Sequence, residues 1–134
     1  MKRKIVLLFC LAIFFLVGSL TLAKGQTYYL DQKVTVTGVL TVMNFTDANG
    51  KLERTYVIKL GKSINVLPSE SSKEYWDFKA ENGIKIMQVY TLNDKIKIRN
   101  FKNKKVRISG TLTPQMTAHH HTPVMVEFTS IGLY

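Results

Sequence analysis

The chain has 134 residues, a formal net charge of +10 and one cysteine, Cys10. This length fits a single small domain, and one cysteine excludes a disulfide framework and a thiolate metal site. Stability must therefore come from a hydrophobic core, which a domain of this size can build.

The N-terminus has the pattern of a secretory signal peptide. Basic residues at 2–4 precede an uncharged apolar run over 5–22, and small residues precede two cleavage bonds. We expect residues 1–23 to be removed, so that an exported protein, periplasmic or secreted, begins at Lys24 or Gln26. Removal of three of the 19 basic residues and none of the nine acidic ones lowers the net charge from +10 to +7. An uncleaved membrane anchor is the alternative, because the apolar run is near the lower length limit of a spanning helix.

Alternation of apolar and polar residues predicts five strands in the remaining chain. The predicted strands are 34–42, 54–60 with an extension over 64–67, 84–92, 105–113 and 123–131. The third is apolar on both parities, which predicts a central strand covered on both faces. Asn49 and Gly50 predict a turn, and Asn103 predicts a left-handed residue before the fourth strand.

Two connections differ in character from the strands. Ser69–Gly83 begins with six polar residues and is predicted to be a surface loop without core residues. Its aromatic residues Tyr75, Trp76 and Phe78 are expected to fold over one end of the core, or to form an aromatic binding patch. The segment 93–104 is a basic connection for which we expect a helical turn.

Gly38 and Gly110 occupy equivalent places in two similar strand sequences, Val34–Thr41 and Val106–Thr113. A glycine in the middle of a strand marks a bulge or a sharp bend. Five strands with two such bends predict an all-β domain over 26–134, a small barrel like the five-stranded oligonucleotide/oligosaccharide-binding (OB) barrel. A small β-sandwich is the alternative.

Three segments resemble the bacterial DUF4431 domain: Tyr56–Leu60, Lys104–Leu112 and His119–Val124. The family's recurring features are a GKKV-x-V-x-G-T-L strand and a following HHT-x-V strand entry. Asn103 stands where the family usually has glycine, and the specific likeness covers roughly 87–128. The resemblance implies a small exported barrel-like module that sometimes accompanies lysozyme-inhibitor-type domains. It implies no activity, because function does not follow from fold.

All three histidines stand together at His119, His120 and His121, followed by Thr122. In an extended segment His119 and His121 face one way and His120 the other, so the first and third could share a metal ion such as zinc. A third ligand would have to come from another strand, and Glu127 has the wrong parity. The other interpretations are a structural loop, with Thr122 capping the turn, and a contact surface that titrates near neutral pH.

A second candidate site is a basic patch opposed only by Asp94. It consists of Lys95, Lys97, Arg99, Lys102, Lys104, Lys105 and Arg107. Such a run is either a solvated face or a surface for an anionic partner. An anionic envelope component or an acidic protein is favoured over nucleic acid, because lysine outnumbers arginine and no exposed aromatic residues are interleaved for stacking.

The sequence therefore predicts an exported, non-catalytic binding or inhibitor-type module. We expect it to contact an envelope component or a protein partner through the His119–Thr122 loop, without a cofactor. Catalysis has little support, because no serine stands near a histidine and acid, and no glycine-rich phosphate loop occurs. The alternatives are a metal-binding or metal-dependent hydrolytic protein that uses the histidines, and a membrane-tethered accessory subunit.

Overall fold

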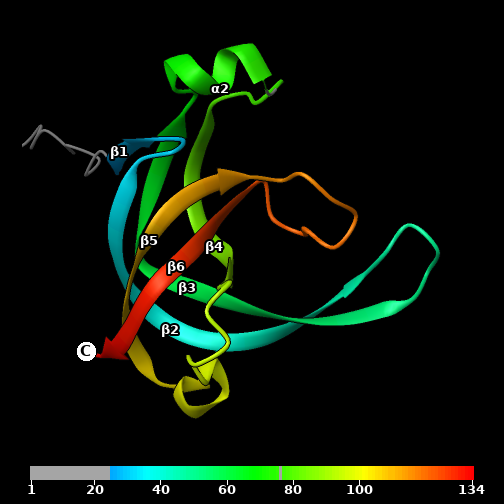
Figure 1. Ribbon diagram of the computed structural model, residues 1–134, viewed down its shortest axis with the longest axis vertical. Coiled ribbons are helices and arrows are strands. Elements are labelled where there is room, and N and C mark those ends of the chain that lie inside the picture. Colours follow the sequence, from blue (N-terminus) through cyan, green and yellow to red (C-terminus); the bar gives the residue numbers. More distant parts are fainter. Residues whose placement is uncertain (1–24, 76) are drawn as a thin grey trace, which may run out of the picture.

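The computed structural model describes residues 25–75 and 77–134, and the expectations for residues 1–23 and for Trp76 lie outside this part (Figure 1). The described chain is mostly strand. In chain order the elements are β1 (Gln26–Tyr29), β2 (Lys33–Thr46), β3 (Leu52–Leu67), helix α2 (Glu70–Tyr75), β4 (Glu81–Tyr90), the 3-10 turn η1 (Ile98–Phe101), β5 (Lys105–Pro114) and β6 (Val124–Leu133). No helix in these ranges is long and apolar enough to cross a membrane.

Five of the strands close into a ring. β2, β3 and β4 form an antiparallel meander, β4 pairs in parallel with β6, and β5 joins β6 back to β2. β1 adds to β3 in parallel outside this ring. The predicted all-β fold is confirmed, and the connectivity is that of the OB-like barrel rather than of two stacked sheets.

The interior of the ring is filled by the alternating apolar residues of the strands. On β5, Val106, Ile108 and Leu112 are buried, whereas Lys105 and Arg107 on the other parity are exposed, as predicted. The core comprises Leu30, Val34, Val36, Leu40, Ile58, Ile64, Val66, Met87, Val89, Val106, Ile108, Leu112, Val124, Val126 and Phe128.

Both mid-strand glycines lie where another strand passes too closely for a side chain. A Cβ atom on Gly38 would overlap the backbone carbonyl of Lys59, and one on Gly110 would overlap that of Glu127. The register of β5 against β6 shifts between Ser109 and Gly110. The predicted bulge is therefore confirmed at Gly110, and at both glycines the absence of a side chain allows the neighbouring strand to approach closely.

The turns also agree with the sequence. Gly50 has φ +79°, and Asn103 has φ +61°, the left-handed conformation expected of it. Asp47 fixes the β2–β3 turn by accepting hydrogen bonds from the backbone N–H groups of Asn49 (2.9 Å) and Lys51 (2.8 Å). The expected helical turn in the basic connection is η1.

Two parts of the chain differ from the prediction. β1 was not predicted, and the predicted surface loop 69–83 contains α2 and the start of β4, whereas β3 continues through the predicted extension to Leu67. The helix forms because Ser69 and Ser72 cap it reciprocally, each side chain accepting the other's backbone N–H at 3.0 and 2.7 Å. Ser72 is consequently buried, but it is not part of the hydrophobic core cluster, so the polar segment 69–74 holds no core residue, as expected. Phe78 does pack against the core, as expected.

Candidate functional site

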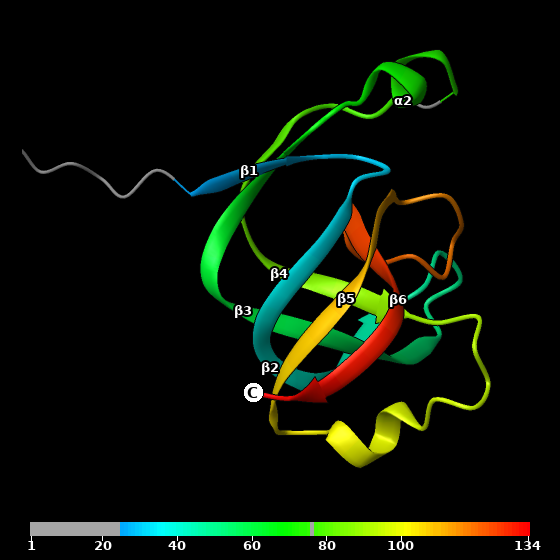
Figure 2. The same ribbon diagram turned by 60° about the vertical axis from the view of Figure 1, so that its left-hand side comes forward.

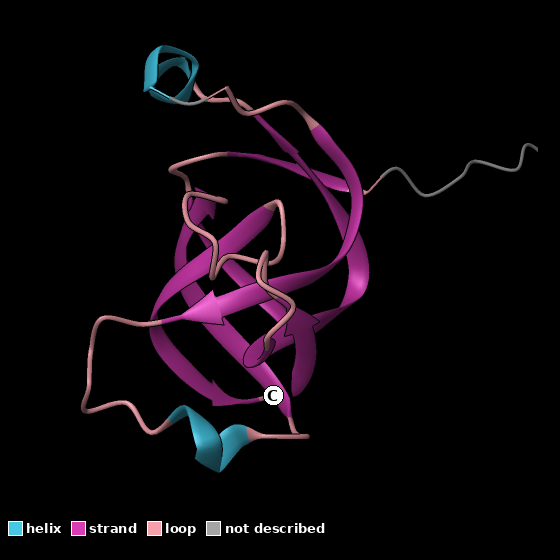
Figure 3. Cartoon of the chain, turned by 90° about the vertical axis from the view of Figure 1, so that its right-hand side faces the viewer, coloured by secondary structure: helices cyan, strands magenta, loops and turns pink. Residues whose placement is uncertain are grey.

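The candidate site is the connection between β5 and β6, residues 115–123, which we call the histidine loop. Its base is closed by a hydrogen bond from the Gln115 N–H to the Pro123 carbonyl (3.1 Å), and a turn joins the His120 N–H to the Thr117 carbonyl (3.0 Å). The loop does not continue straight off the ring. It lies beside the long β2–β3 hairpin, in front of the strands (Figures 1 and 3).

The loop covers the outer face of β3, β4 and β6. Val57, Gln88 and Met125 are neighbours across these three strands and face outward, away from the core cluster. All three are nevertheless buried. The predicted coverage on both faces is therefore confirmed for Met87, Gln88 and Val89, whose outer cover is the histidine loop, whereas Lys85 and Leu92 are exposed.

Gln88 attaches the loop backbone to the sheet. Its side-chain N–H donates to the His119 carbonyl (3.1 Å), and its side-chain oxygen accepts the His121 N–H (2.8 Å). The Thr122 hydroxyl accepts the Gln88 backbone N–H (2.9 Å) and donates to the Val124 carbonyl (2.8 Å). These bonds satisfy buried polar groups that would otherwise be unpaired, which is the condition for burying an amide at all.

The β2–β3 hairpin holds two of the imidazole rings. Phe45 and Glu53 face each other across its strands. One carboxylate oxygen of Glu53 lies 2.6 Å from Nδ1 of His119, and the other lies 2.8 Å from Nε2 of His121. The Phe45 ring stacks on His121 with centroids 4.6 Å apart and planes 2° from parallel. The hairpin therefore holds the loop through the Glu53 carboxylate and through the stacked Phe45 ring.

These hydrogen bonds define the protonation states of Glu53, His119 and His121. The hydrogen bonds from His121 and His119 lower the pKa of Glu53, so its carboxylate is ionised and accepts from both rings. His119 then carries a proton on Nδ1 and His121 one on Nε2. The side chain of His121 is only 7% exposed and that of His119 is 74% exposed, so Nε2 of His119 is the ring atom presented to solvent.

His120 turns the other way, onto β4. Its ring stacks on Tyr90 at a centroid distance of 5.9 Å, and its Nδ1 accepts the backbone N–H of Met116 (3.0 Å). Burial, followed by repulsion from His119 and His121, lowers the pKa of His120. Since a protonated Nδ1 could not accept the Met116 N–H, this ring is held neutral with its proton on Nε2.

The predicted division of the histidines is thus observed, since His119 and His121 share one partner and His120 faces elsewhere. Thr122 caps the turn, as the structural interpretation required. The partner, Glu53, was missed, and so was the burial of His121 in a loop taken to be polar. The turn at Asn49 and Gly50 places Phe45 opposite Glu53, but no local pattern indicates which loop docks on that hairpin.

His119 and His121 were the candidates for a shared zinc ion. In the described ranges, no three His, Cys, Asp or Glu residues are grouped so that they could hold a metal ion. Each ring nitrogen that faces Glu53 is already paired with its own carboxylate oxygen. Glu127, which the sequence argued against as a ligand, instead accepts a hydrogen bond from the Tyr90 hydroxyl (3.1 Å). Burial raises the pKa of that hydroxyl.

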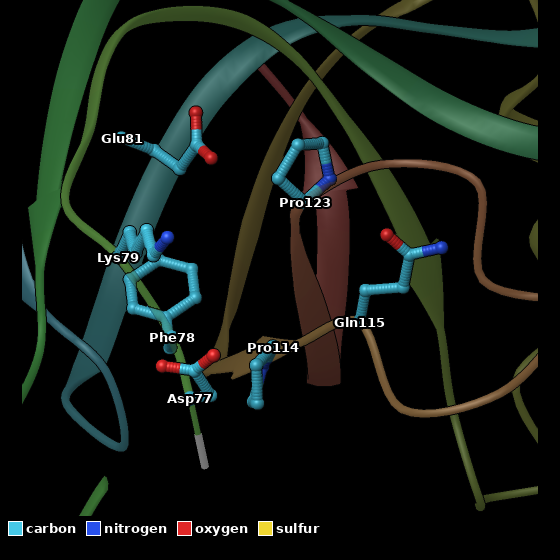
Figure 4. A pocket seen from close by; sticks show the side chains of 7 residues that line it. All are labelled: Asp77, Phe78, Lys79, Glu81, Pro114, Gln115 and Pro123. Atoms are coloured by element: carbon cyan, nitrogen blue, oxygen red, sulfur yellow. The ribbon is translucent and has the colours of Figure 1, made fainter. Parts of the chain in front are cut away.

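A pocket of about 420 Å³ adjoins the loop where it leaves and rejoins the ring (Figure 4). One wall comes from the ends of the loop and the other from the segment between α2 and β4. The lining residues are Asp77, Phe78, Lys79, Glu81, Pro114, Gln115 and Pro123. A phenylalanine and two prolines beside charged groups give a mixed surface of the kind that takes part in specific contacts.

The basic patch is spread along the β4–β5 connection and the start of β5. All seven of its members are exposed, and no ion pair involving any of them occurs within residues 25–75 and 77–134. Lys97 and Lys104 donate to the backbone carbonyls of Asp94 and Asn100. Arg107 lies 4.9 Å from the ring centre of Tyr134, a neighbouring exposed aromatic that the sequence analysis overlooked.

Residues 86–131 match the family model of a domain of unknown function, DUF4431. The match confirms the resemblance seen in the sequence and supports a DUF4431-like domain in this chain. It includes Gln88 and the whole histidine loop, whereas Phe45 and Glu53 lie before it. No curated protein sequence matches the chain.

Proposed function

We propose that this protein is an exported, non-catalytic binding module of inhibitor type, and that the histidine loop is its contact surface. The partner is an envelope component or another protein. Export rests on the signal-peptide pattern of residues 1–23. The contact surface rests on the geometry of the loop and of the pocket beside it.

The observation that carries this proposal is a loop whose inner side is bonded to the sheet and the β2–β3 hairpin and whose outer side is exposed to solvent. Gln88, Glu53 and Phe45 hold its backbone and its inner rings. The side chain of His119 and that of Met116, 44% exposed, face outward. A loop that is ordered before it meets a partner loses little conformational entropy on binding, which favours affinity.

The pocket extends this surface. Gln115 and Pro123 are the two ends of the loop and also line the pocket, and Pro114 lines it from the end of β5. A partner that contacts His119 and Met116 can therefore also place a side chain against Phe78. The exposed loop and the pocket beside it can therefore be contacted by the same partner, with close packing in the pocket and polar contacts around it.

The test is capture of a partner from envelope extract by the immobilised protein, followed by comparison of variants. The double change His119→Ala and Met116→Ala should abolish capture and leave the thermal midpoint nearly unchanged, because both side chains are largely exposed. Leu133→Ala is the matched control, since it removes an exposed apolar side chain from the far end of β6. Retained capture by the double variant would contradict the proposal.

The same protein samples test the metal alternative. If zinc raised the thermal midpoint of the wild-type protein but not that of His119→Ala, binding of a metal to the folded state would be the better account. Under our proposal zinc at equimolar concentration leaves both midpoints unchanged.

A further inference from the structure

A second cleft opens where β1 and β2 diverge. β1 pairs only with β3, and the first half of β2, Lys33–Thr37, pairs only with β5. The two strands are joined by the turn at 30–32 and then separate (Figure 2). Between them lies a cleft of about 420 Å³, which shares no residue with the histidine loop.

The cleft combines an apolar floor with hydrogen-bonding walls. Its lining residues are Gln26, Tyr28, Thr35, Val36, Thr37, Leu60, Gly61, Lys62, Ile64 and Tyr134. Val36 and Ile64 are core residues reached from outside, and Tyr28 packs against the same core. The walls supply an amide, two phenols, two threonine hydroxyls and one ammonium group, and no acidic side chain lines them.

The surface beside the cleft is basic. Thr37 on its wall is the cross-strand neighbour of Arg107, whose guanidinium lies over the Tyr134 ring. Two residues further along β2, Val39 pairs with Lys59 on β3 and with Lys105 on β5. These cations are exposed, and none of them is paired with a carboxylate within the described ranges. The basic patch therefore continues from the β4–β5 connection to the rim of the cleft.

We propose that this cleft binds a short acidic oligosaccharide. A sugar ring has an apolar face that packs on tyrosine and a rim of hydroxyl groups that pair with amides and hydroxyls, which matches the two kinds of wall. Carboxylate or sulfate groups on the chain would pair with Arg107, Lys62 and the cations beyond them. The site is independent of the proposed function of the histidine loop.

A nucleic acid fits the cleft less well. Single strands are bound by stacking successive bases on several exposed aromatic rings. Here Tyr28 is packed against the core and Arg107 covers one face of Tyr134, so the cleft lacks a row of free rings, whereas one remaining ring face is enough for a single sugar ring. Charge alone would attract either polymer. The hydroxyl-rich and amide-rich wall is what favours a saccharide.

The experiment is titration of the purified protein with tetrasaccharides of galacturonate, hyaluronan and heparin. Binding is measured by isothermal titration calorimetry and by the NMR chemical shifts of the backbone amides of Thr37 and Ile64. We expect at least one to bind and to shift both signals. The double change Lys62→Gln and Arg107→Gln should weaken that binding by about tenfold or more, as loss of charge-assisted hydrogen bonds predicts. If galacturonate is the saccharide that binds, methyl esterification of its carboxylates should weaken its binding to the wild-type protein to a similar extent.

The charge-matched control is the double change Lys51→Gln and Arg54→Gln, because both residues are exposed on the β2–β3 hairpin and neither lines the cleft, and it should bind like the wild-type protein. The proposal is overturned if none of the three acidic tetrasaccharides binds, or if the double variant binds as well as the control. It is also overturned if an eight-nucleotide thymidylate binds more tightly than every saccharide, which would assign the cleft to nucleic acid.

Discussion

Glu53 determines how the three histidines differ. Its carboxylate holds His121 against Phe45 inside the loop and orients His119 at the surface, while His120 lies out of its reach on Tyr90. Residues that are adjacent in the sequence thus have separate roles. Replacing all of them together would mix a structural effect with a binding effect.

Single substitutions should separate the two effects. His121→Ala removes a buried ring, its hydrogen bond to Glu53 and its stack on Phe45, so we expect a loss of about 1–3 kcal/mol in the free energy of unfolding. His119→Ala removes an exposed ring and should change it by less than about 0.5 kcal/mol. Urea unfolding at neutral pH measures both, and equal losses would contradict the assigned burial.

His120 should make stability depend on pH. Its pKa in the folded state lies below the ordinary value of 6.5, so the unfolded chain takes up a proton first as the pH falls. Stability is then unaffected well above pH 6.5 and decreases as the pH falls from 6.5 toward the folded pKa. His120→Asn retains an acceptor for the Met116 N–H but cannot titrate. Urea unfolding between pH 7.5 and 5.5 should show a steeper loss for the wild-type protein, and parallel curves would refute this role.

Part of this site could be predicted from residue order alone. The alternation of side chains along an extended segment separates His120 from its neighbours, and the structure agrees. Glu53 could not be found in this way, because it lies 66 residues from His119 in sequence and reaches it only through the register of the β2–β3 hairpin. A non-local contact of this kind leaves no periodic signal.

At the scale of elements, the strands with alternating burial were predictable and the short elements were not. β5 has one parity that is buried over its whole length and one that is exposed or half-buried, and its limits were predicted to within one residue. β1 has four residues and no alternation of apolar residues, and α2 has six residues stabilised by one pair of serines. Neither is long enough to give a pattern.

The two parities of β5 should respond differently to truncation. Leu112→Ala leaves a cavity in a fully buried position and should cost about 2–5 kcal/mol. Lys105→Ala shortens an exposed side chain and should have little effect. Thermal unfolding of the two variants gives the comparison, and a similar loss in both would show that the strand faces are assigned wrongly.

At the scale of the whole molecule, two glycines and five strand patterns were enough to predict ring closure. What they could not indicate was the packing of the histidine loop on the outside of the ring. That packing depends on Gln88 of β4, whose side-chain amide bonds to the loop through both its N–H and its oxygen. A single glutamine in a strand is too common to be read as an anchor.

The whole-chain prediction concerns export. When the gene product is expressed in a bacterium with its own leader, material outside the cytoplasm should begin at Lys24 or Gln26, because small residues precede both bonds. N-terminal sequencing checks this. Protein that is found in the membrane and still begins at Met1 would favour the tethered alternative.

The central claim is that the histidine loop is fixed on the outer sheet face before any partner binds. Amide hydrogen exchange of the free protein tests it most directly. The His121 N–H bonds to Gln88 and the Gln88 N–H bonds to Thr122, at 2.8 and 2.9 Å. Both should exchange far more slowly than the amide of exposed Ala118, with protection close to that of core strands. Exchange of the His121 amide at the rate of Ala118 would mean that the loop is not held, and would contradict the claim.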